Sequence, residues 1–129
     1  MNILFVEDNA MNRRIVGEML RAAGLAMDEA EDAAAGLDLI ERKQYDLVLM
    51  DIRMPGMDGL AATEMIRARA DEKAATPVVV ITADTAPNLR EECLRRGADG
   101  FLTKPVIMDN LFDVIGQVLA AGGGEMVLA

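Results

Sequence analysis

The sequence predicts a single α/β domain in which helices cover both faces of a parallel β-sheet. Along the chain, five strand-like apolar segments alternate with five helix-like segments, and three of the strand-like segments are uninterrupted apolar runs. A strand inside a parallel sheet is buried on both faces, so it lacks the polar alternation of a half-exposed strand. Regular alternation of strands and helices is typical of doubly wound folds with right-handed crossovers.

The predicted strands cover residues 3–6, 25–30, 47–50, 78–81 and 101–102, and the second is the least apolar of the five. Pro77 directly precedes the fourth, where its missing N–H does little harm to the strand ladder.

The predicted helices lie between and after these strands, and each carries apolar residues at helical spacing. The positions, helix by helix, are Ile15, Met19 and Ala23; Ala33, Leu37 and Ile40; Ala62 and Ile66; Leu89 and Cys93; and Leu111, Val114, Ile115 and Val118. Asn9 and Asp32 are suited to cap the first two helices. Gly24 and Gly97 stand where the first and fourth should end. Pro87 is expected in the first turn of the fourth.

Composition limits the class of protein. A chain of 129 residues with 52% apolar residues is expected to form one folded domain, here residues 1–121 followed by a flexible tail over 122–129. The net charge of −9 argues against direct binding of nucleic acid or of an anionic membrane. The single cysteine excludes an internal disulfide and fits a cytoplasmic location. The ten methionines are expected to fill the core.

The polar residues that could take part in catalysis or metal binding lie at the ends of the predicted strands. Glu7 and Asp8 follow the first strand, Asp51 follows the third, Thr82 the fourth, and Lys104 comes shortly after the fifth. The carboxyl ends of parallel strands meet at one edge of the sheet, and ligands of such folds bind there. We therefore expect these five side chains to form one site.

The charges of this site indicate a metal ion. Three carboxylates and one lysine leave a formal charge of −2, and crowded carboxylates cannot all stay ionised without a compensating cation. The donors are oxygens and the chain has no histidine, which favours Mg²⁺, with Mn²⁺ as a possible substitute. Asp51 could then act as a nucleophile that forms an acyl phosphate. Lys104 and the ion would stabilise the phosphoryl charge, and Thr82 could bond a phosphate oxygen.

The motifs FVED, DIRMPGMDG, ITA and GFLTKP occur in this order. The chain thereby resembles the response-regulator receiver domains of two-component signalling from residue 2 to about residue 120. The resemblance implies a flavodoxin-like (βα)₅ fold with strand order 2-1-3-4-5. It also implies a phosphorelay module that takes a phosphoryl group from a histidine kinase or a histidine phosphotransfer protein. Such a domain catalyses only its own phosphorylation and dephosphorylation, so we do not expect a metabolic enzyme.

The resemblance also assigns roles. Asp51 matches the phospho-acceptor, Asp8 the direct Mg²⁺ ligand, Glu7 its water-mediated companion and the main-chain carbonyl of Arg53 the third protein ligand. Lys104 matches the lysine that pairs first with the acid and later with the phosphate.

Further positions match the moving and docking parts of the family. Thr82 matches the hydroxyl that moves to the phosphate, and Phe101 the aromatic switch that follows it. The switch is expected to alter a surface formed by the fourth helix, fifth strand and fifth helix, where an unknown downstream protein would bind. The Lys104–Pro105 bond is expected to be cis. The residues that match the docking rim for the phosphohistidine donor are Asn12, Ile15, Pro105 and Val106.

Two departures and several alternatives stay open. Glu7 replaces the commoner aspartate, and Phe101 lacks the tyrosine hydroxyl, which favours a plain core residue at position 101 over a switch. The segment Glu7-Asp8-Asn9 followed by Asn12 resembles receivers of hybrid kinases and of single-domain regulators, between which the sequence does not decide.

Three other classes compete with this interpretation. An aspartyl-phosphate phosphohydrolase would need an acid where Arg53 stands. A flavodoxin-like cofactor binder would need a Ser/Thr/Gly-rich loop after the first strand, where this chain has Asn9-Ala10-Met11-Asn12. A degenerate receiver that serves only as a binding surface would not need the full set of site residues.

Overall fold

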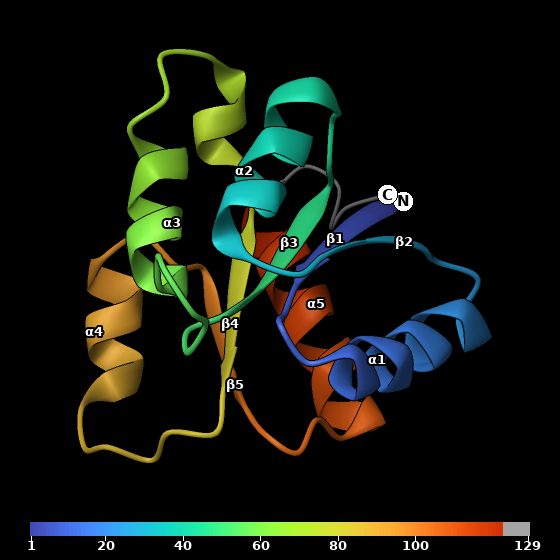
Figure 1. The fold of residues 1–129 in the computed structure, drawn as a ribbon. Helices are drawn as coiled ribbons and strands as arrows, with labels where there is room; N and C mark the ends of the chain where they lie inside the picture. The colour runs from blue at the N-terminus through green and yellow to red at the C-terminus, as the bar shows by residue number, and fades with distance from the viewer. Residues whose placement is uncertain (123–129) are drawn as a thin grey trace.

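The computed structural model describes residues 1–122 and confirms the doubly wound α/β architecture, with one parallel sheet in the order β2-β1-β3-β4-β5 (Figure 1). The strands are β1 (Asn2–Val6), β2 (Ala26–Ala30), β3 (Leu47–Asp51), β4 (Val78–Thr82) and β5 (Gly100–Thr103). The helices are α1 (Ala10–Ala22), α2 (Ala33–Arg42), α3 (Gly59–Arg67), the 3₁₀ turn η1 (Glu72–Ala75), α4 (Leu89–Arg95) and α5 (Met108–Gly122).

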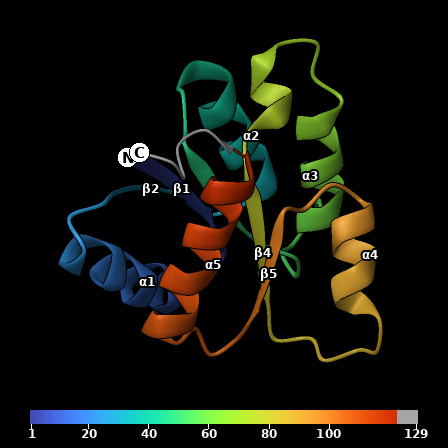
Figure 2. The same cartoon turned by 180° about the vertical axis from the view of Figure 1, so that it is seen from behind.

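Helices cover both faces of the sheet. Figures 1 and 2 show α1 and α5 on one face and α2, α3 and α4 on the other. Along β1, Ile3 and Phe5 pack with residues of α1 and α5, whereas Leu4 and Val6 pack with residues of α2 and α3. Successive side chains of a strand point to opposite faces, so an uninterrupted apolar strand supplies both cores at once.

The helix boundaries follow the predicted local signals. The side chain of Asn9 accepts a hydrogen bond from the Asn12 N–H at the start of α1, and Asp32 caps α2 through the Ala35 N–H. Gly24 and Gly97 have positive φ angles of 77° and 116°, and both lie just beyond the end of a helix, α1 and α4 respectively. A left-handed residue ends a helix most easily when it has no Cβ.

The prediction for Pro87 is wrong. Helix α4 begins at Leu89, so Pro87 lies outside it, and Asn88 between them is left-handed with a φ of 66°. The side chain of Asp84 accepts a hydrogen bond from the Ala86 N–H at 2.9 Å. This local bond holds the loop after β4 in a turn and delays the start of the helix.

The expectation that the methionines fill the core is only partly right. Met50 and Met54 are buried in the cluster under α2 and α3. The large exposed apolar residues include five other methionines, namely Met1, Met11, Met57, Met65 and Met108.

Most of the predicted tail, residues 122–129, lies outside the described residues; Gly122 is the last residue of α5. Among residues 1–122, no helix combines the length and the apolar character that crossing a membrane requires.

Gly59, the first residue of α3, lies against the end of β3. A Cβ on Gly59 would stand 2.0 Å from the carbonyl oxygen of Asp51 and 2.9 Å from the side chain of Met50. The Gly59 N–H also donates to the carbonyl of Ile52 at 3.0 Å. Helix α3 can therefore approach the strand end this closely only because residue 59 has no side chain.

We expect Gly59→Ala to lower the free energy of unfolding by roughly 3 kcal/mol, because the added methyl must push backbone atoms aside. The matched control is Gly116→Ala in the middle of α5, where a Cβ meets nothing within 4 Å. This control should stabilise the protein by about 1 kcal/mol through helix propensity. Urea unfolding of both variants measures the two changes; equal effects at the two positions would contradict the steric argument.

Candidate functional site

The strand register brings the predicted site residues to one edge of the sheet. Val6 is paired with Met50, Asp51 with Ile81, and Thr82 with Thr103, so β1, β3, β4 and β5 end at nearly the same level. Glu7 follows directly on β1 and Lys104 directly on β5. The site thus depends on strand pairing and not on the path of a single loop.

The three carboxylates converge at this edge. One oxygen from each of Glu7, Asp8 and Asp51 lies within 4.8 Å of the others. Glu7 is fully buried and Asp51 is 2% exposed, whereas Asp8 is exposed. Two of the carboxyl groups therefore lie inside the protein, and the third lies at its surface.

Lys104 is the cation that faces the buried pair. Its Nζ lies 2.7 Å from Glu7 Oε1 and 3.4 Å from Asp51 Oδ2. Its main-chain N–H donates to the carbonyl of Thr82 at 2.8 Å, which fixes the end of β5 beside β4. The Lys104–Pro105 peptide bond is cis. The closer partner of the lysine is Glu7, a preference that the sequence did not indicate.

The N-cap residue and the first turn of helix α1 supply further donors to Glu7. The Asn9 N–H donates to Oε2 at 3.2 Å, and the side-chain amide of Asn12 donates to Oε1 at 3.4 Å. Asn12 was predicted only as part of a docking rim, because residue spacing cannot show that its amide turns inward.

The ionisation of the site follows from burial and from these contacts. Burial and the adjacent Glu7 carboxylate raise the pKa of Asp51 to about 7, against the opposing effect of Lys104. Burial alone would raise the pKa of Glu7, but its bonds with Lys104 and Asp51 outweigh burial and lower it. Asp8 is exposed, but the water that it loses to its neighbours and the adjacent Glu7 carboxylate together raise its pKa. Without a further cation, Asp51 is the carboxyl that keeps a proton near neutral pH.

Thr82 and Arg53 flank the acidic cluster. Thr82 is fully buried at the end of β4, and its hydroxyl oxygen accepts a hydrogen bond from the Asp84 N–H at 3.1 Å. The exposed side chain of Arg53 forms an ion pair with Asp84. Asp84 thereby joins the loop after β3 to the loop after β4.

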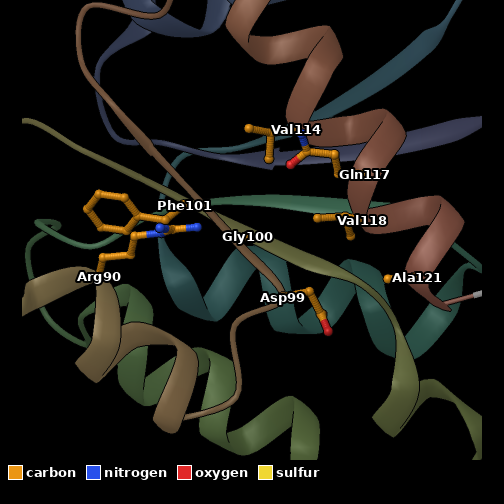
Figure 3. Close-up of a pocket in the computed structure, with 8 residues that line it drawn as sticks. All are labelled: Arg90, Asp99, Gly100, Phe101, Val114, Gln117, Val118 and Ala121. Carbon is orange, nitrogen blue, oxygen red and sulfur yellow. The ribbon is translucent and has the colours of Figure 1, made fainter.

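Phe101 is partly buried on β5 and packs against the cluster formed by Ile52, Leu60, Val80, Cys93 and Ala98. It also lines a cavity of about 350 Å³ between α4 and α5. Figure 3 shows Phe101 and Arg90 at one end of this cavity and residues of α5 along the other side. The ring therefore has core contacts on one side and open space on the other.

The four predicted docking residues lie together. Asn12, Ile15, Pro105 and Val106 line a small pocket of about 90 Å³. Glu7 and Lys104 also line it, so this pocket adjoins the acidic cluster.

A comparison with protein-family models assigns residues 3–116 to the response regulator receiver domain. The chain belongs to this family. It is a receiver domain of two-component phosphorelay systems, with the flavodoxin-like fold that its sequence motifs imply.

The similar curated proteins include long sensor kinases. The receiver domain is 37% identical to part of the sensor protein GacS of Pseudomonas syringae, over 88% of this chain and 13% of that protein. It is 36% identical to part of the sensor histidine kinase RcsC of Salmonella typhimurium, over 93% of this chain and 12% of that protein. The chain thus spans about one-eighth of the length of these relatives.

Solved structures agree with the fold. The receiver domain of a sensor histidine kinase from Pseudomonas aeruginosa superposes with a TM-score of 0.83 at 34% identity, covering 92% of this chain and 97% of that one. That structure holds a magnesium ion in its active-site cleft. The chemotaxis protein CheY4 of Vibrio cholerae superposes with a TM-score of 0.83 at 27% identity, over 91% of this chain and 97% of that one.

The raised pKa of Asp51 implies that the free energy of unfolding depends on pH. Since the folded state holds this proton up to about pH 7 and the unfolded state only to about pH 4, unfolding is expected to become easier as the pH rises between these values. In metal-free protein at pH 8, Asp51→Asn should therefore stabilise the fold by on the order of 4 kcal/mol. The gain should vanish towards pH 4.

Urea unfolding across this pH range measures the effect. Asp38→Asn is the matched control, because Asp38 is exposed on α2 and forms an ion pair with Arg42 on the same helix. A stabilisation by Asp51→Asn that does not depend on pH would contradict the assignment of the proton to Asp51.

Proposed function

We propose that Asp51 accepts a phosphoryl group from a phosphohistidine on a histidine kinase or histidine phosphotransfer protein, in a reaction that requires Mg²⁺. The observation that carries this proposal is the burial of Asp51 at the end of β3, within reach of two further carboxylates and one lysine. The Asp51 carboxylate is the last group of β3, at the sheet edge where a donor would approach.

The residues present fit a Mg²⁺ ion. The converging ligands are all oxygens, and within residues 1–122 one lysine, Lys104, forms ion pairs with the buried carboxyl groups. Glu7, Asp8, Asp51 and the carbonyl of Arg53 would hold the ion, and Mn²⁺ could replace it. When bound, the ion supplies positive charge that stabilises the transferring phosphoryl oxygens.

The chain's own residues then have distinct tasks. An oxygen of ionised Asp51 attacks phosphorus, the new O–P bond forms as the N–P bond to the donor histidine breaks, and the departing imidazole takes up a proton. Lys104 already lies 3.4 Å from Asp51, so its ammonium can turn from the carboxylate to a phosphoryl oxygen. Hydrolysis of the acyl phosphate would complete a cycle in which the domain acts only on itself.

Phosphorylation would then shift the domain between two conformations. The Thr82 hydroxyl would leave the Asp84 N–H for a phosphoryl oxygen. Phe101 would move by packing alone, towards the space that Thr82 vacates. The α4–β5–α5 surface, which contains the cavity beside Phe101, would then present a different face to a downstream protein. The donor would dock on the rim formed by Asn12, Ile15, Pro105 and Val106.

Intact-mass spectrometry tests the acceptor. With Mg²⁺ and a small acyl phosphate as donor, we expect a single phosphoryl adduct on the wild-type domain and on Asp38→Asn, and none on Asp51→Asn. The adduct should disappear when a chelator removes the metal. An adduct that persists on folded Asp51→Asn would place the acceptor elsewhere.

Mg²⁺ binding should depend on pH, because the ion displaces the proton that Asp51 holds with a pKa of about 7. Affinity is expected to rise roughly tenfold per pH unit below that value and to level off above it. Calorimetric titration in buffers of different ionisation enthalpy reports both the affinity and the proton released. Binding that stays constant from pH 5.5 to 8 would mean that the ion does not contact Asp51.

A further inference from the structure

We propose that Arg13 is a positioning residue for the acidic site. It anchors the peptide group between Glu7 and Asp8 and so determines where these two carboxylates stand. The inference rests on the proposed Mg²⁺ site and adds a residue from outside the predicted ligand set.

Arg13 reaches the site from the first turns of α1. Its Nη1 donates to the carbonyl oxygen of Glu7 at 2.6 Å, and its Nε lies 2.9 Å from Glu29 Oε1 on β2. The Arg13 side chain is only 16% exposed, whereas that of the neighbouring Arg14 is 75% exposed. Arg13 is therefore held in one orientation by two hydrogen-bond acceptors, whereas an exposed arginine on a helix surface is free to move in water.

The carbonyl of Glu7 lies where the strand ladder ends. The Glu7 N–H makes the last bond to β2, to the carbonyl of Ala30 at 3.0 Å, and β2 ends at that residue. Glu7 itself is fully buried, so its carbonyl needs a donor from another element. The planar guanidinium of Arg13 supplies this donor, and its ion pair with Glu29 holds it in place.

Arg13 completes a set of three hydrogen bonds to Glu7 from the N-terminal end of α1. The main-chain N–H of the N-cap Asn9 and the side-chain amide of Asn12 contact the two carboxylate oxygens of Glu7, and the Arg13 guanidinium contacts its main-chain oxygen. With Glu7 fixed at both ends, its side chain points to Lys104. Asp8, joined to the same peptide group, is left at the mouth of the site, where a metal ion can enter.

Charge and positioning make opposite predictions for Arg13. As a cation near three carboxylates, Arg13 should weaken Mg²⁺ binding, so its removal would strengthen binding if charge were its only effect. If Arg13 positions Glu7 and Asp8, its removal should weaken binding although the site becomes more negative. The sign of the change therefore decides between the two roles.

The experiment is a calorimetric Mg²⁺ titration of wild type, Arg13→Ala and Arg14→Ala, with thermal unfolding to establish that each variant is folded. We expect Arg13→Ala to raise the Kd by roughly tenfold or more, as for other residues that orient metal ligands. Arg14→Ala removes the same charge one position away and should leave the Kd unchanged or slightly lower. Arg13→Lys keeps the charge but cannot donate to Glu7 and Glu29 together, so an intermediate Kd is expected.

An Arg13→Ala Kd equal to or below that of wild type would overturn the proposal. If Arg13→Ala is unfolded at the assay temperature, Arg13→Lys carries the test: a Kd at least about threefold above wild type supports positioning, and an unchanged Kd overturns it. Wild-type protein that binds no Mg²⁺ would overturn the metal site itself, an outcome that the wild-type titration alone identifies.

Discussion

The structure depends on the crowding of two buried carboxylates around one lysine. Glu7 and Asp51 are both removed from water, and Lys104 contacts both. A buried charge without a partner is strongly unfavourable, so this group of three is stable only with a shared proton or an added cation. In the proposed function the added cation is the metal ion, and ionisation of Asp51 on metal binding prepares its carboxylate to attack phosphorus.

The sheet makes this crowding possible. Parallel strands bring sequence positions as distant as 7, 51 and 104 to one edge, and the apolar strands on both sides hold that edge rigid. Helix α1 adds the donors that keep Glu7 in one orientation. The rest of the fold can thus be understood as a frame that keeps like charges close together in a low-dielectric place.

The fold and the cluster could be predicted because both follow from patterns along the chain. Uninterrupted apolar strands mark a parallel sheet, and strand ends mark its ligand edge, which is why Asp51 and Lys104 could be placed together. The start of α4 could not be predicted, because the turn closed by Asp84 competes with the helix start that Pro87 suggested. The role proposed for Arg13 could not be predicted either. A hydrogen bond from its guanidinium to a carbonyl six residues earlier leaves no periodic pattern in the sequence.

Gly59 has a consequence for how related sequences should be interpreted. Its contact with the Asp51 carbonyl leaves space for hydrogen alone, so selection would hold this position fixed although it offers no functional group. In a comparison of many receivers, we expect this position to vary little. Invariance beside a reactive residue therefore has two sources, reactivity and lack of room, and only the three-dimensional contact separates them.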